Sequence, residues 1–124
     1  MTGAWTNDEL RAIEAEDELR IATRRQDRTL RRPVIVWVVR QDDEVYIRSV
    51  GGRTASWFRG AQTTHDAHVE IDELAQDVTL VETDDRGDEI DAAYREKYGR
   101  YAGIVDHVLT PEARAATLKL VPRS

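Results

Sequence analysis

The chain has 124 residues, a formal net charge of -6, a pI near 5.1 and no cysteine. A chain of this length fits one domain over residues 1–124 and buries roughly two thirds of the surface of its extended form. The cysteine count excludes disulfides, thiolate metal ligands and cysteine nucleophiles. The acidic charge argues against nucleic acid as a partner, because such binding depends on neutralising phosphates.

The hydrophobic pattern indicates a cytoplasmic protein with no membrane partner. The longest apolar run, Val34 to Val39, is far shorter than the roughly 20 residues of a membrane-spanning helix. The N-terminus also lacks the basic-then-apolar order of a signal peptide. Arginine supplies nearly all the positive charge, since Lys97 and Lys119 are the only lysines. Codon bias is the simpler explanation, and bidentate phosphate or carboxylate recognition is the alternative.

The N-terminal segment predicts a helix. Thr6 and Glu9 have the spacing of a capping box, and Trp5 and Leu10 flank them as a hydrophobic staple. The helix should run from Asn7 to about residue 15.

Strand patterns follow. Leu19 and Ile21 alternate with polar residues, whereas 24–32 is polar and basic and should form an exposed loop. The β-branched run 34–39 predicts a strand covered on both faces. The turn 41–43 joins it to a second strand over 45–50, which together form a hairpin.

The second half alternates helices with strands. Ser56 is the expected N-cap of a short helix, and strands are expected over 67–71 and 78–83. Apolar residues at helical spacing predict a helix over 88–98, with Gly99 in a left-handed C-cap.

The C-terminal part completes the predicted architecture. A helical turn or two is expected over 104–109, another helix start at Thr110-Pro111, and a closing strand over 117–121. Six short, mostly antiparallel strands with a few flanking helices predict a mainly β, α+β fold. Closure into a barrel would free these strands of exposed edges.

The loop over residues 48–53 is the best candidate site. Gly51 and Gly52 let the backbone expose N–H groups, Ser49 offers a hydroxyl, and Arg48 and Arg53 could both face an anion. Trp57 could stack on a planar ring. The simpler interpretation is a glycine turn with solvated arginines and a core tryptophan, and on local grounds it is the better one.

A resemblance to a known family favours the ligand-binding interpretation of this loop over the glycine-turn interpretation. The strands that lead into Arg48-Ser49-Val50-Gly51-Gly52 and Trp57-Phe58, and the strand at 65–71, resemble the flavin-binding split β-barrel superfamily. The likeness is greatest to its deazaflavin-dependent nitroreductases. The tyrosine-spaced segment 94–101 and the strand 118–122 are similar to that group too. The chain looks like an uncharacterised subfamily, one known as a domain of unknown function.

The resemblance implies a six-stranded split barrel, a homodimer with FMN or a deazaflavin coenzyme at the subunit interface, and an oxidoreductase acting on a small organic substrate. The site residues that it implies fall into two groups. Ser49, Gly51 and Gly52 would lie along the ring, Arg53 near the phosphate or ribityl chain, and Trp57 would brace the loop. Tyr98 and Tyr101 would line the substrate side.

Two departures from the group's pattern support an alternative function. Residues 29–33 contain no glycine where the group has a glycine-containing phosphate loop, and the sequence leaves open whether Arg31 and Arg32 replace that loop. Arg59-Gly60 replaces an asparagine. The alternative is a non-catalytic dimeric module that binds a different small ligand or a protein partner.

Two further clusters have simpler explanations. His65 and His68 lie three apart in an expected strand and would point to opposite faces, so no metal site is expected. The acidic segment 82–91 should form a solvated turn and an acidic helix start.

Overall fold

Six strands close into an antiparallel barrel, as the sequence predicts. The computed structural model describes residues 4–84 and 86–123. Around the barrel the strand order is β1-β2-β3-β6-β5-β4, and all six neighbouring pairs are antiparallel. The strands are β1 Glu18–Thr23, β2 Val34–Gln41, β3 Glu44–Arg48, β4 Asp66–Ile71, β5 Leu74–Glu82 and β6 Thr117–Pro122.

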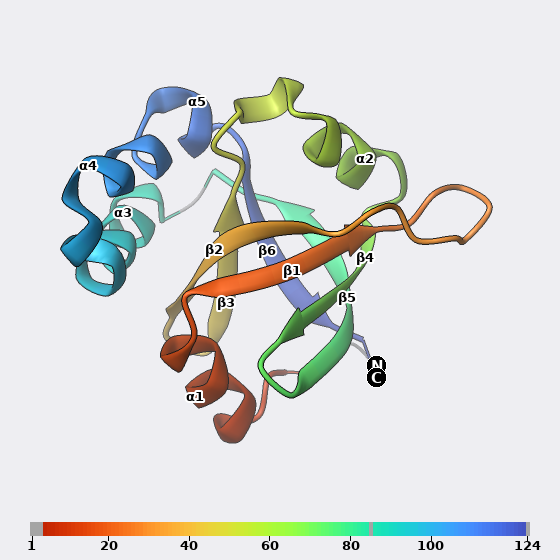
Figure 1. The fold of residues 1–124 in the computed structure, drawn as a ribbon, viewed down its shortest axis with the longest axis horizontal. Helices are drawn as coiled ribbons and strands as arrows, with labels where there is room; N and C mark the ends of the chain where they lie inside the picture. The colour runs from red at the N-terminus through yellow and green to blue at the C-terminus, as the bar shows by residue number, and fades with distance from the viewer. Residues whose placement is uncertain (1–3, 85, 124) are drawn as a thin grey trace.

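The helices lie around the outside and at the two ends of the barrel (Figure 1). One end carries α1 and the opposite end carries α2, while α3, α4 and α5 gather on one side. The α-helices are α1 Asn7–Ala15, α2 Ser56–Thr64, α3 Gly87–Tyr98, α4 Ala102–Val105 and α5 Pro111–Arg114. Short 3-10 turns lie at Gly52–Thr54, Gly99–Tyr101 and Asp106–Val108. No helix within the described ranges is long and apolar enough to span a membrane.

The predicted caps of two helices are confirmed. The Thr6 hydroxyl accepts from the Glu9 N–H at 3.1 Å, and the Glu9 carboxylate accepts from the Thr6 N–H at 2.8 Å. Thr110 caps α5 in the same way, accepting from the N–H of Ala113. These local bonds explain why both helices begin where the sequence places them.

Three local predictions were wrong. Gly99 has right-handed dihedrals (φ -58°, ψ -25°), because the chain continues from α3 into a 3-10 turn rather than reversing. The N-cap of α2 is Ala55, without a side-chain bond, and Ser56 is already helical. Strand β5 begins at Leu74, four residues before the predicted start, because Asp72 (φ 51°) allows a two-residue turn after β4.

Two hydrophobic cores hold the fold together. The barrel interior contains the side chains of Val38, Val45 and Ile47 with those of the other strands. A second core lies outside β2 and β3, where Val39 and Tyr46 pack under α3 and its neighbours. Side chains of a strand alternate between its faces, so the same hairpin supplies both cores.

Candidate functional site

The turn after β3 lies at the barrel end that α2 covers. The Ser49 N–H donates to the carbonyl of Ala116 at 3.1 Å, and the Gly52 N–H donates to the carbonyl of Ser49 at 3.0 Å. Gly52 needs its glycine, because its φ is +74° and a Cβ there would lie 3.4 Å from the Cβ of Glu112. The Ser49 hydroxyl is fully buried and has no hydrogen-bond partner among the described residues.

Arg48 points away from this turn into the outer core. Its guanidinium donates to the carboxylate of Asp91, the carbonyl of Val108 (2.8 Å) and the hydroxyl of Thr117 (3.1 Å). Only 2% of Arg48 and 6% of Asp91 are exposed. Asp91 is therefore not part of a solvated acidic segment, as the sequence suggested, but the counter-ion of a buried arginine.

Arg53 is exposed and bonded within the chain. It pairs with Glu82 at 2.8 Å, donates to the carbonyl of Ala115 at 3.0 Å, and lies 5.4 Å from the ring centroid of Phe58. Trp57 is half-buried, packs against the barrel core and meets the Phe58 ring edge to face. The predicted binding role of each residue stays a prediction.

Arg31, at the end of the β1–β2 loop, has a different environment. Within the described chain its guanidinium has no ion pair, and its Nε is buried without a hydrogen-bond partner. The side chain packs against α2 at Gly60, where a Cβ would lie 2.9 Å from that Nε. Arg31 also lines a pocket of about 150 Å³ with Leu30, Pro33 and His68. Sequence reasoning counted this loop as a weakness of the flavin interpretation, since it lacks glycine.

Other arginines of the loop anchor it to the barrel. The carboxylate of Asp66, of which 6% is exposed, pairs with Arg28 at 2.9 Å and with Arg123 at 2.6 Å. Arg24 lies 3.7 Å from the same carboxylate and pairs with Asp77 at 3.2 Å. These ion pairs hold the first half of the loop at Arg24 and Arg28. The Arg31 N–H donates to the carbonyl of Thr23 at 2.8 Å, which fixes the backbone at the other end.

Tyr98 and Tyr101 gather around Trp37, not around the Ser49–Gly52 turn. Tyr98 is fully buried, and its ring stacks on Trp37 with centroids 4.0 Å apart. Its hydroxyl accepts from the Val38 N–H at 3.0 Å and donates to the Asp17 carbonyl at 2.7 Å. Burial raises the pKa of Tyr98 above its usual range.

Tyr101 is the accessible member of the pair. It lines a pocket of about 440 Å³ with Trp37 and Ile104 beside the junction of α1 and β1. Its hydroxyl donates to the carboxylate of Asp17 at 3.0 Å. The hydrogen bond from Arg100, the largest cause, lowers the pKa of Asp17.

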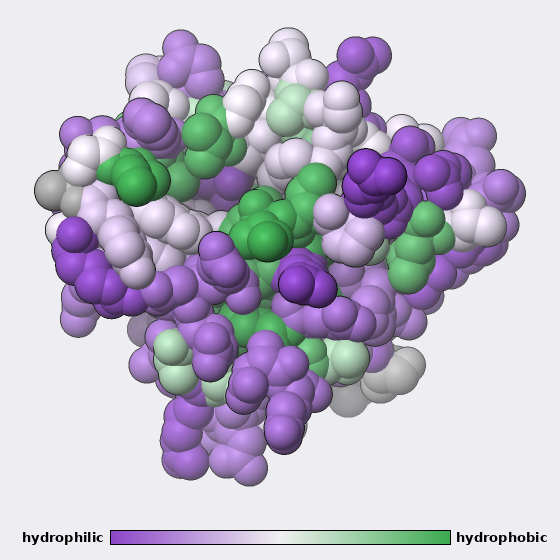
Figure 2. Space-filling model, viewed as in Figure 1, coloured by the Kyte–Doolittle hydropathy of each residue, from purple (hydrophilic) through white to green (hydrophobic). Residues whose placement is uncertain are grey.

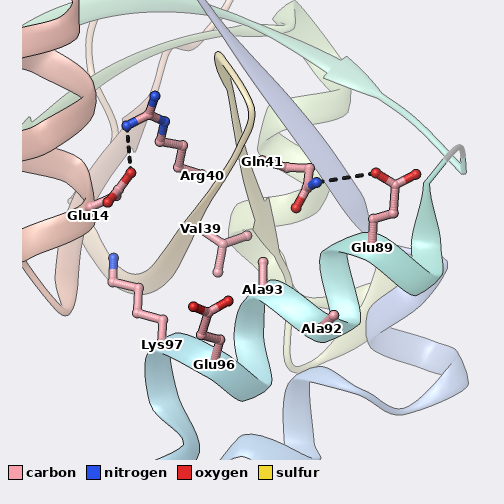
Figure 3. Close-up of a pocket in the computed structure, with 9 residues that line it drawn as sticks. All are labelled: Glu14, Val39, Arg40, Gln41, Glu89, Ala92, Ala93, Glu96 and Lys97. Atoms are coloured by element: carbon pink, nitrogen blue, oxygen red, sulfur yellow. Dashed lines mark hydrogen bonds and ion pairs between the residues drawn. The ribbon is translucent and has the colours of Figure 1, made fainter.

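A third pocket, of about 460 Å³, lies between α3, the end of β2 and α1 (Figure 3). Its lining includes Lys97, whose pKa burial lowers to about 8. Sequence reasoning did not single out Lys97, although it is one of only two lysines in the chain.

The two histidines of the 65–68 segment do not converge. His65 is exposed and ends α2 with left-handed dihedrals, whereas Nδ1 of His68 lies 2.9 Å from a carboxylate oxygen of Asp77. Within the described part of the chain, no three His, Cys, Asp or Glu side chains gather as metal ligands would.

Comparisons with known proteins identify a family and a fold. A family model described as "Uncharacterized protein conserved in bacteria (DUF2255)" matches residues 9–120. No curated protein sequence matches the chain.

Solved structures resemble the chain over most of its length. The heme storage protein HutZ from Vibrio cholerae has a TM-score of 0.68 at 12% identity, covering 95% of this chain and 90% of that one. A FAD-binding protein from Mesorhizobium loti has a TM-score of 0.63 at 12% identity, covering 100% and 94%. An F420-H2 dependent reductase has a TM-score of 0.60 at 17% identity, covering 85% and 93%. At these identities the likeness shows the split-barrel fold, which serves proteins with different ligands.

Proposed function

We propose, from the premise that this chain belongs to the DUF2255 family of uncharacterized bacterial proteins and has the split-barrel fold, that it binds a flavin or deazaflavin cofactor. In this proposal the protein is an oxidoreductase acting on a small organic substrate. The bound cofactor would supply the hydride chemistry, and the chain would supply binding, orientation and exclusion of water.

The observation that carries the proposal is the unpaired guanidinium of Arg31. A buried nitrogen donor without a partner is costly, and a phosphate oxygen is a strong acceptor for it. Gly60 supports the same interpretation, because only glycine leaves room for the Arg31 side chain against α2. Arg32, exposed at the next position and without an ion pair in the described chain, adds a second positive charge.

We propose that the turn after β3 contacts the ring of such a ligand. The Ser49 hydroxyl is a second buried polar atom without a partner, and it lies at the barrel end that also carries α2. We assign the phosphate to Arg31, and the ring edge to Ser49, Gly51 and Gly52. Arg48 is left out, since its donors are already bonded in the outer core. Arg53 is secondary. The pocket of Tyr101 and Trp37 lies beside the junction of α1 and β1, away from this turn, so we do not assign the substrate to it.

A second copy of the chain would complete this site. Ile35 on β2 is 55% exposed, and Leu30 in the preceding loop is 40% exposed. Figure 2 shows hydrophobic side chains at the centre of the face that β1 and β2 present. An exposed apolar patch of this kind favours a protein partner, and we propose a homodimer through this face.

Fluorescence titration with FMN, FAD and the deazaflavin coenzyme tests the binding proposal. We expect one of them to bind, and we expect Arg31→Ala to weaken that binding about 10- to 100-fold, the value of one charged hydrogen bond. The matched control is Arg86→Ala, because Arg86 pairs with Asp42 and Glu89 at the start of α3. Arg53→Ala should weaken binding less than Arg31→Ala.

Two outcomes would overturn the proposal. One is failure of every flavin to bind, above all if hemin binds instead. The other is equal affinity in the Arg31 and Arg86 variants. A stable dimer without flavin binding or reductase activity would favour the non-catalytic alternative, which the glycine-free loop 29–33 supports.

A further inference from the structure

A pocket with aromatic walls lies beside the exposed outer face of β1 and β2. It has a volume of about 440 Å³, and its lining includes Trp37 and Tyr101. Tyr98 covers one face of the Trp37 ring, with centroids 4.0 Å apart and planes 5° apart. Trp37 is only half-buried, and its accessible part faces the pocket.

The rim of this pocket is acidic. Glu16, Asp17 and Glu18 line it, against one basic residue, Arg100. Arg100 pairs with Asp17 and lies 4.7 Å from the ring centroid of Tyr101. The pocket therefore holds one guanidinium between a carboxylate and an aromatic ring, which both attract it. Glu16 and Glu18 form no ion pair with any residue that the structure describes.

Four outward-facing residues form a block next to the pocket. The register of β1 and β2 pairs Glu18 with Trp37 and Arg20 with Ile35. Directly opposed residues share a face of the sheet, as do residues two apart in one strand. The block measures roughly 7 Å along the strands and roughly 5 Å across them. Figure 2 shows hydrophilic side chains beside the hydrophobic ones on this face.

Arg20 has no partner within the chain. It is exposed, and it forms no ion pair or hydrogen bond with residues 4–84 or 86–123. Its neighbour on the other side, Glu70 of β4, lies 3.4 Å from His68 instead. A free arginine and a free glutamate, Glu18, therefore lie on one surface without pairing with each other.

A two-fold axis through this block brings complementary groups together. In such an interface, residue i of one copy contacts residue j of the other, and j contacts i. A half-turn about the centre of the block exchanges its diagonal corners. Arg20 of the partner subunit then meets Trp37, beside Glu18, and both copies of Ile35 stay within the interface.

We propose that Arg20 of each subunit enters this pocket of the other, where its guanidinium stacks on Trp37 and pairs with Glu18. The inference rests on the homodimer proposed above and adds the contact that fixes its symmetry. Arginine suits this contact, because its planar group can stack on a ring and pair with a carboxylate at the same time.

Charge reversal tests the pairing. Glu18→Arg brings arginines against each other across the interface, and Arg20→Glu does the same with glutamates. Each variant alone should therefore raise the dissociation constant of the dimer at least about 100-fold. An equimolar mixture of the two variants should form heterodimers, since every reversed side chain then meets an opposite charge. Light scattering gives the masses, and native mass spectrometry shows whether each dimer holds one copy of each variant.

Matched controls separate this contact from general charge effects. Arg95→Glu on α3 and Glu112→Arg on α5 make the same charge changes at exposed residues without ion pairs in the described chain, and both should stay dimeric. Ile104→Asp should stay dimeric too, because it adds a carboxylate to the pocket.

The outcomes distinguish this inference from the homodimer itself. Dimers in both charge-reversal variants, with monomers for Ile35→Asp, would overturn the pairing and leave the face intact. Two monomeric variants that form no heterodimer when mixed would also overturn the pairing. A monomeric wild type would overturn both proposals. Rescue by mixing would support the pairing, because variants that had failed to fold could not restore each other.

Discussion

Arginines that look alike in the sequence have different roles in the structure. Arg48 and Arg53 flank the same glycine turn, yet one is buried against Asp91 and the other is exposed beside Glu82. Strand alternation places Arg48 on the face opposite Ser49, and the sequence shows that much. It does not show that α3 brings an aspartate to that face, since 43 positions separate the two residues.

The buried pair makes Asp91 a residue that the fold depends on. Asp91→Asn keeps the shape but leaves the Arg48 guanidinium buried without a counter-ion, so unfolding should become easier by about 3–5 kcal/mol. Asp88→Asn is the matched control, because the side chain of Asp88 is 96% exposed and should change stability by less than ~0.5 kcal/mol. Urea denaturation of both variants measures this, and similar midpoints would refute the role of the pair.

Two glycines of the chain should respond in opposite ways to alanine. Gly52→Ala should destabilise by about 1–2 kcal/mol, because Gly52 has a φ of +74° that alanine adopts only with strain. Gly99→Ala should stabilise by about 0.4–1 kcal/mol, since Gly99 has helical dihedrals and open space around it. Thermal melting of the two variants gives the comparison, and a loss of stability in both would contradict it.

At the scale of elements, α3 connects the outer core with the pocket lined by Lys97 and with the pocket lined by Tyr101. Its residues Tyr98 and Lys97 both hydrogen-bond the backbone of Val38 in β2. Lys97 also donates to the carbonyl of Ile13 in α1, and Tyr98 donates to the carbonyl of Asp17 just after α1. The sequence predicted the helix from its apolar spacing. The same spacing placed Lys97 on the face of Ile90 and Tyr94, whereas the groups that its amine would contact depended on distant elements.

The docking of α3 should depend on pH through Lys97. Because folding lowers the pKa of Lys97 to about 8, the folded chain binds fewer protons than the unfolded chain between pH 8 and roughly 10.4. The contribution of Lys97 to stability should therefore rise with pH across that window, by up to about 1 kcal/mol per pH unit.

Lys97→Arg isolates this contribution, because arginine stays charged throughout and the other titrating groups are shared. The free energy of unfolding, measured in urea at several pH values, should increase in the wild type relative to the variant between pH 8 and pH 10. A constant difference would mean that Lys97 keeps its ordinary pKa in the folded protein.

Elements defined by neighbouring residues were predicted best. The capping box of α1, the Pro111 start of α5 and the hairpin of β2 and β3 each depend on residues a few positions apart. The early start of β5 was missed because Leu74 to Asp77 lack β-branched residues, and pairing with β4 stabilises them instead.

For the whole molecule, the number of strands predicted a barrel, but the site depends on how that barrel closes. The antiparallel pairs β1–β2 and β2–β3 put the loop carrying Arg31 and the turn at Ser49 at one end, and the closing pair β1–β4 brings α2 to that end. The pairing of distant strands is not contained in any local pattern, and this is why the sequence named the turn but left open whether Arg31 reaches it.

The exposed outer face of β1 and β2 gives the last prediction, on assembly. Two chains of 14.2 kDa should form a dimer of about 28 kDa, measured by light scattering after gel filtration. Ile35→Asp should yield monomers, because it puts a charge at the centre of the proposed interface. Ile104→Asp is the control, since Ile104 is equally exposed, at 56%, but lies on α4. A monomeric wild type, or dimers in both variants, would exclude this face as the interface. Flavin titration of the Ile35 variant would then show whether the proposed cofactor site needs both subunits.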